Sequence, residues 1–147
     1  MNASATIPLL VTPPPLPDDG LTYSLLPATA DDGFPQAFLM SLQSVVYRLT
    51  MTVCYPDPAL IVGRDDANTL FDLPDPVRGL YLNLMLEFEQ QPPPSRLIGT
   101  RRAVLDLPMA FGPLRLRFKR IRIAQANLRR PGAYGSELRA EVAVGNG

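Results

Sequence analysis

The side chains that could perform chemistry in this sequence are carboxylates, arginines and one cysteine, because histidine is absent. A cysteine nucleophile needs a nearby base, and imidazole is the usual one. We therefore interpret Cys54 as a small buried or half-buried hydrophobe within a strand. A single cysteine also excludes a disulfide within the chain. The glycines lack the spacing of a phosphate-binding loop.

Four aspartates are the best candidates for acid–base or calcium chemistry. They fall in one predicted loop, at Asp65, Asp66, Asp72 and Asp75. Aspartates beside proline and glycine are typical of turns, and neighbouring loop carboxylates do not by themselves converge on a substrate. Calcium prefers oxygen ligands, but the twelve-residue pattern ending in glutamate is missing. We predict no enzyme, no cofactor and no metal site.

Basic residues form the most distinctive local pattern. Between residues 114 and 123, apolar side chains alternate with basic ones, as in a strand that has one buried and one exposed face. The alternation slips at Lys119 and Arg120, which predicts a β-bulge. The exposed face would carry Arg115, Arg117, Lys119, Arg120 and Arg122, and four more arginines could extend it: Arg101, Arg102, Arg129 and Arg130.

This basic strand has three interpretations. It is a solvated or ion-paired structural face, an inter-subunit contact, or a phosphate-binding surface. Acidic partners could come from the N-terminal half of a neighbour, or from Glu87 and Glu89 on the adjacent strand. Five phosphate contacts would give a salt slope of about −0.9 per contact. Single-strand binders interleave aromatic side chains with basic ones, whereas Phe118 is expected on the apolar face. Nucleic acid is therefore the weaker alternative.

Charge is segregated along the sequence. Residues 1–95 contain eleven acidic and three basic residues, a net of −8, and residues 96–147 contain three acidic and eleven basic residues, a net of +8. Thirteen of the fourteen basic residues are arginine. Arginine binds carboxylates through a planar fork and tolerates burial at interfaces. The segregation favours head-to-tail contacts between subunits.

Period-two alternation predicts most of the chain as strands. The expected strands cover residues 45–55, 79–89, 101–107, 114–123 and 137–144, and residues 59–62 are compatible with a further short one. The last two strands form a hairpin through residues 131–135, and residues 63–78 are a loop. Residues 35–42 match helical spacing, with a start at Asp32 or Gly33. The predicted fold is all-β and mainly antiparallel, a β-sandwich or partly open barrel of five to seven strands with one short helix.

The first 34 residues are expected to form an extended arm, before a single domain at 35–147. Seven of the seventeen prolines lie within residues 1–35, and Pro13–Pro15 favours polyproline II. A disordered tail would usually lack large apolar residues. The arm has seven that could contact another surface: Ile7, Leu9, Leu10, Val11, Tyr23, Leu25 and Leu26. We predict a strap that lies on another surface.

The function expected from these features is structural and non-enzymatic. No basic residue precedes Arg48, so a signal peptide is not predicted, and no apolar run is long enough for a membrane span. By architectural analogy, we expect a soluble component of a virion or phage-tail-like particle, such as a tail, baseplate, neck or capsid accessory protein, or of another large cytoplasmic assembly. Its partners would be other protein subunits, including copies of itself, and no small-molecule substrate. The alternative is a nucleic-acid-binding β-domain that uses residues 115–122.

Overall fold

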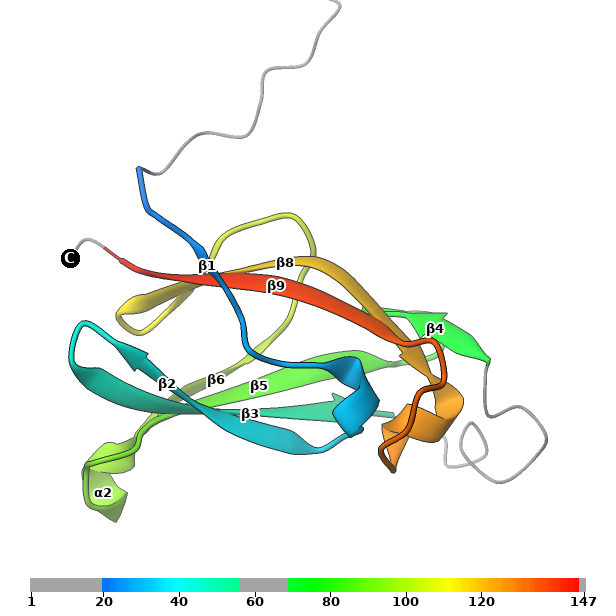
Figure 1. Ribbon diagram of the computed structural model, residues 1–147, viewed down its shortest axis with the longest axis horizontal. Helices are drawn as coiled ribbons and strands as arrows, with labels where there is room; N and C mark the ends of the chain where they lie inside the picture. The colour runs from blue at the N-terminus through cyan, green and yellow to red at the C-terminus, as the bar shows by residue number, and fades with distance from the viewer. Residues whose placement is uncertain (1–19, 56–68, 146–147) are drawn as a thin grey trace, which may run out of the picture.

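Two antiparallel sheets pack face to face in the computed structural model, which describes residues 20–55 and 69–145 (Figure 1). One sheet contains, in spatial order, β1 (Ser24–Leu25), β9 (Glu137–Val144), β8 (Leu114–Ala124) and β4 (Leu70–Asp72), and β7 (Met109–Phe111) also pairs with β8. The other contains β2 (Gln36–Leu42), β3 (Val45–Cys54), β5 (Tyr81–Phe88) and β6 (Leu97–Arg102). The predicted mainly antiparallel all-β fold is confirmed, and the sheets do not close into a barrel.

Helical segments in the described ranges are short. They are η2 (Ala30–Asp32), α2 (Pro93–Arg96) and η4 (Gln125–Leu128). Within those ranges, no helix has the length and apolar character needed to cross a membrane. Several predictions lie outside the described residues: the contacts of Ile7, Leu9, Leu10 and Val11, the Pro13–Pro15 run, the strand at 59–62, and Asp65 and Asp66.

The core lies between the sheets and is built from alternate residues of the two central strands. On β5, the side chains of Leu82, Leu84 and Leu86 are fully buried. On β8, the side chains of Leu114, Leu116 and Phe118 are fully buried in the same cluster. Each buried side chain of this size contributes about 1.5–3 kcal/mol relative to an exposed one. The alternating pattern that predicts these strands therefore also identifies the face of each sheet that packs against the other sheet.

The C-terminal hairpin is confirmed together with its bulge. Strands β8 and β9 pair along their lengths, and residues 131–135 lie in the connection between them. The register shifts between Phe118 and Arg120, which lie opposite Ala140 and Arg139. The extra residue keeps Ile121 on the buried face and lets the basic side chains continue along the outer face.

The helix predicted at residues 35–42 is wrong, because this segment is strand β2. Met40 is buried and Phe38 is half-buried, whereas Leu39 is exposed, so the segment follows a period of two. A two-residue turn with positive φ at Gln43 and Ser44 reverses the chain and pairs β2 with β3 along its whole length. Pairing across the hairpin overrides the local helical spacing.

The structure also differs from the sequence-based predictions in the bounds of two strands and in the burial of one residue. The predicted loop at 63–78 contains β4, whose Phe71 is buried in the core. The strand predicted at 101–107 lies instead at residues 97–102. One further backbone hydrogen bond, from the N–H of Ala103 to the carbonyl of Leu82, joins the chain to β5 after Arg102, and the positive φ at Asp106 then interrupts the extended path. Cys54 is exposed at the end of β3, because it falls on the outward parity of that strand.

Residues 20–34, assigned to the arm from sequence, pack against the domain. Leu26, Ala30 and Phe34 are all buried in the main core. The backbone N–H of Leu26 donates to the carbonyl of Ala140, which continues the short pairing of β1 with β9. Leu25, by contrast, is 75% exposed. The part of the arm next to the domain therefore behaves as an edge of its own sheet.

Candidate interaction face

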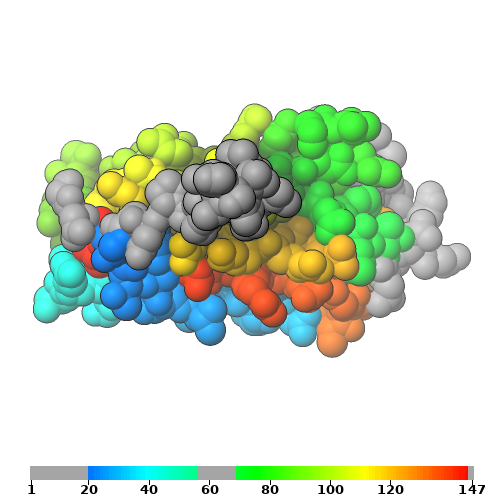
Figure 2. Space-filling model, turned by 90° about the horizontal axis from the view of Figure 1, so that it is seen from above, coloured from blue at the N-terminus to red at the C-terminus, as the bar shows by residue number. Residues whose placement is uncertain are grey.

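The outer side of the β1-β9-β8-β4 sheet carries the charged pattern detected in the sequence, and we call it the basic face. Figure 2 looks onto this side, where β8 in gold and β9 in orange-red run side by side between the green of β4 and the blue of residues 20–30. The face comprises Arg115, Arg117, Lys119, Arg120 and Arg122 of β8, Glu137, Arg139 and Glu141 of β9, and Asp72 of β4. Six of these nine residues are basic and three are acidic.

Three of the arginines on the basic face are held by carboxylates on neighbouring strands. Arg117 contacts Glu141, its direct cross-strand partner, at 2.9 Å. Arg120 contacts Glu137 at 3.4 Å. Arg122 donates to both oxygens of Asp72, at 2.8 and 3.4 Å, across the β4–β8 pair. The strand register therefore determines which arginine meets which carboxylate.

These pairs position side chains more than they stabilise the fold. The hydrogen bond from Arg122 lowers the pKa of Asp72, and the same bond raises the pKa of Arg122. The Asp72 side chain is nevertheless 70% exposed, and exposed ion pairs contribute under about 1 kcal/mol each. Their main effect is to fix three guanidinium groups in defined orientations on one surface.

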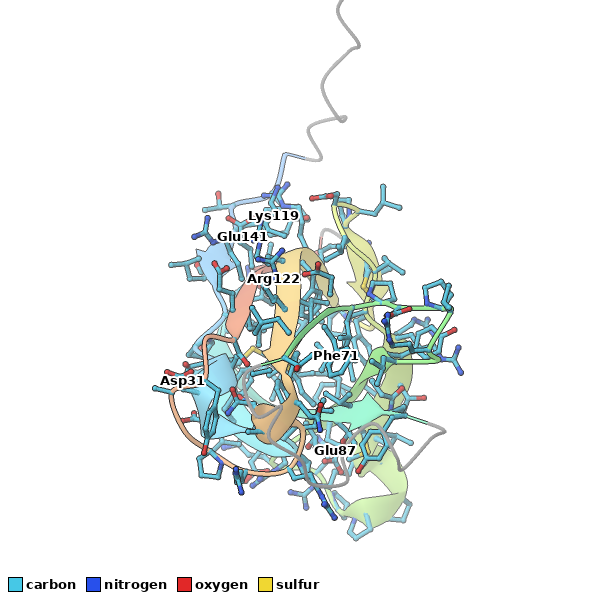
Figure 3. All side chains as sticks on the ribbon, turned by 90° about the vertical axis from the view of Figure 1, so that its right-hand side faces the viewer. Asp31, Phe71, Glu87, Lys119, Arg122 and Glu141 are labelled. Carbon is cyan, nitrogen blue, oxygen red and sulfur yellow. The ribbon has the colours of Figure 1, made fainter. Side chains whose placement is uncertain are left out.

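Positive charge remains on the face after pairing. Lys119 and Arg139 are exposed, and neither has a carboxylate partner within the described ranges. Arg115 donates to the carbonyl of Leu114, at 3.1 Å. Figure 3 shows Lys119, Arg122 and Glu141 grouped on one side of the molecule. The arrangement can accept an anionic surface without first breaking its internal pairs.

The arm joins the domain at this same face. The ring centre of Tyr23 lies 3.9 Å from the guanidinium carbon of Arg117, so the guanidinium meets an aromatic ring as well as Glu141. Such a cation–π contact contributes about 0.5–1 kcal/mol at an exposed site. Sequence reasoning included Tyr23 among arm contacts but did not predict this intramolecular partner.

Glu87 and Glu89 do not lie beside the basic strand, which corrects the sequence-based expectation. Glu87 belongs to β5, in the other sheet, and Glu89 directly follows that strand. Glu87 lies on the opposite side of the molecule from Lys119 (Figure 3). Glu89 binds Arg48 through two bonds of 2.9 Å and Arg96 through one of 2.8 Å. The bond from Arg48 is the largest cause of a lowered pKa at Glu89.

The four arginines expected to extend the ladder are placed elsewhere. Arg101 and Arg102 belong to β6 in the other sheet, and Arg102 stacks on Tyr81 at 4.2 Å. Arg129 and Arg130 follow η4, and Arg130 lies 5.6 Å from the Tyr134 ring. The residue that does extend the basic face is Arg139. Arg139 alternates with the apolar Leu138 and Ala140 in the segment predicted as a strand at 137–144, so a period of two places it on the outer face and the sequence contained the signal.

The remaining chemical candidates are separate from one another. Asp75 is bound by Arg78 at 2.8 Å, and Asp72 is bound by Arg122, so these carboxylates are neutralised individually. In residues 20–55 and 69–145, no group of three potential ligands among histidine, cysteine, aspartate and glutamate could hold a metal. Cys54 borders a shallow hollow with Tyr81 and Arg102.

Comparisons with known proteins provide no relative for this chain. No protein-family model matches the sequence, and no curated protein or solved structure matches it significantly.

Proposed function

We propose that this protein is a non-enzymatic structural subunit of a large assembly, such as a virion or phage-tail-like particle. Its contacts would be made by the basic face and by the N-terminal segment that joins it. One observation carries the proposal: the root of the arm is held at the basic face by Tyr23 on Arg117 and by the pairing of β1 with β9. A partner that binds the face would therefore also meet this root, residues 23–25.

The charge of the face fits an acidic protein partner. Three basic groups remain beyond the three ion pairs, and the first 95 residues of the chain carry a net charge of −8. A neighbouring copy could supply that acidic surface in a head-to-tail contact. Complementary charges of this kind mainly set the rate of association and the choice of partner.

Removal of residues 1–19 tests the role of the arm. We expect the truncated chain to remain folded, because the deletion ends before Leu26 and Ala30, which belong to the core. Its association should be weaker than that of the full chain, since the contacts proposed for residues 1–19 would be lost. Light scattering would measure the mass of both proteins over a concentration series, and circular dichroism would confirm the fold. The same number of subunits per particle for both proteins at every concentration would exclude a role of the arm in assembly.

A nucleic-acid-binding function is the alternative favoured by Arg115, Lys119 and Arg139, which lack carboxylate partners on the face. Three phosphate contacts would give a salt slope of roughly −3. The double variant Lys119→Glu/Arg139→Glu should then abolish oligonucleotide binding, whereas Arg129→Glu, an exposed arginine outside the face, should leave most of it. Fluorescence anisotropy at about 50 mM salt provides the measurement. Absence of binding by the unaltered protein would eliminate this alternative.

A further inference from the structure

The free edge of β2 has none of the features that usually keep edge strands apart. Edge strands are protected by shortness, charge, internal proline or bulges. In the described sheets, β1, β4 and β7 are two or three residues long, and β6 carries Arg101 and Arg102. Strand β2 has seven residues, Gln-Ala-Phe-Leu-Met-Ser-Leu, with no charge, no proline and no register shift against β3.

The backbone groups that point from this edge can be identified from the neighbouring strands. The carbonyl of Val46 accepts from the N–H of Glu89, at 3.0 Å, so the backbone of Val46 faces away from β2. Its partner across the β2–β3 ladder is Ser41, which must also face away from β3, towards the free edge. Because the direction of the backbone N–H and C=O groups alternates along a strand, those of Leu39 and Ala37 also point towards the free edge. Within the described ranges, no hydrogen bond outside the ladder uses the backbone of these three residues.

The side chains along the edge are small or apolar. Ala37, Leu39 and Ser41 all lie on the exposed outer face, and Leu39 is 51% exposed. The charged residue beside Leu39 on β3 is Arg48, which is already bound to Glu89. A strand that adds to this edge therefore meets no unbalanced charge on β2 or in the adjacent row of β3.

We propose that β2 pairs antiparallel with β2 of a second copy of this chain, across a two-fold axis at Leu39. This register places Leu39 opposite Leu39 and Ala37 opposite Ser41, and it joins the two four-stranded sheets into one. The three outward-facing residues of each copy would then form about six backbone hydrogen bonds across the interface. A closed two-fold contact of one surface with itself is the commonest arrangement in homo-oligomers.

A second copy fits this edge better than the N-terminal segment of a neighbour does. The apolar part of that segment contains Pro8, and Pro13–Pro15 follows it. Proline has no N–H for a ladder, so an added strand from this segment would leave acceptors of β2 unpaired. Strand β2 itself has a donor at every residue. The inference does not depend on the basic face, which lies on the other sheet.

Substitution of Leu39 tests the interface and its register. Like charges directly opposite on paired strands are destabilising, so Leu39→Lys and Leu39→Glu should each weaken the dimer by about tenfold or more. An equimolar mixture of the two variants should restore dimers, because only the proposed register places residue 39 opposite residue 39. Thr100→Lys is the matched control, since Thr100 is exposed in β6 on the far edge of the same sheet and should leave the dimer unchanged.

Light scattering on the full chain and on the chain without residues 1–19 completes the test. The proposal requires that the truncated protein still dimerise, and that this dimer be lost on Leu39→Lys and recovered in the mixture. A monomeric truncated protein, or a dimer insensitive to Leu39→Lys, would overturn it. Mixed variants that stay monomeric would overturn the two-fold register. Failure of the arm to affect assembly would contradict the proposed function and leave the β2 interface intact.

Discussion

Asn127→Asp is expected to destabilise the fold by about 3–5 kcal/mol, because it places a carboxylate in a fully buried site without a cation. The amide nitrogen of Asn127 donates to the carbonyls of Arg130 and Gly132, at 3.1 and 3.0 Å. Its oxygen accepts from the hydroxyl of Ser136, which in turn accepts from the backbone N–H of Ala124. An ionised aspartate has no donor for the two carbonyls and would repel them.

The loss should depend on pH in a defined direction. Burial against two carbonyl oxygens raises the pKa of a carboxyl, so the introduced side chain would bind its proton more tightly in the folded protein than in the unfolded chain. The loss of stability is then smallest below the pKa of this carboxyl in the unfolded chain, about 3.9. It increases as pH rises towards the higher pKa of the same carboxyl in the folded protein. Urea unfolding at pH 7 and at about pH 4 would measure it. The control is Asn83→Asp, on the half-buried outer face of β5. Equal losses for both variants would contradict the role of Asn127.

Strand prediction from this sequence succeeded where the two faces of a strand differ in polarity over many residues. Strands β3, β5, β8 and β9 have this property, and each coincides closely with a segment predicted as a strand. Residues 36–42 lack polar contrast, so the apolar residues match periods of two and 3.6 over one short stretch. Strands β1, β4 and β7 are too short to show a period.

For the candidate site, the sequence predicted the outward residues of a single strand but not their partners on the neighbouring strands. Parity and the bulge were sufficient to place Arg117 and Arg122 on the outer face of β8. Their partners depend on register and sheet order, which are tertiary properties, so Glu141 and Asp72 were not identified. Asn127 had no signal at all, because a single polar residue in a short segment reveals neither its burial nor its three hydrogen-bonding partners.

The charge segregation of the sequence is partly neutralised within one molecule. Among the described residues, three ion pairs join the acidic half to the basic half: Asp72 with Arg122, and both Glu87 and Glu89 with Arg96. Arg117 and Arg120 instead use the few carboxylates of their own half. Opposite charges in distant parts of the sequence therefore help to align strands within the fold. The positive charge of the basic face that is not ion-paired would be available to contact a partner.

Gly33→Ala is expected to cost about 3–5 kcal/mol, since it combines backbone strain with a collision against the main chain. Gly33 has a φ of 75°, which favours glycine. A Cβ atom there would lie 2.5 Å from both the carbonyl carbon and the oxygen of Arg130. Two hydrogen bonds secure this crossing of the arm root and the β8–β9 connection: Gly132 to Asp31 at 2.8 Å, and Phe34 to Asn127 at 3.0 Å.

Gly135→Ala separates the two causes of that loss. Gly135 also has a positive φ, of 93°, but the nearest atom to its added Cβ is Cδ2 of Leu70 at 4.0 Å. This control should lose about 1–2 kcal/mol, the strain alone. Urea unfolding would compare the two variants, and limited proteolysis of Gly33→Ala should show earlier cleavage within residues 20–34, where the arm root is displaced. Equal stabilities would mean that the chain can separate at this crossing, and the arm root would then not be anchored by its contact with the β8–β9 connection.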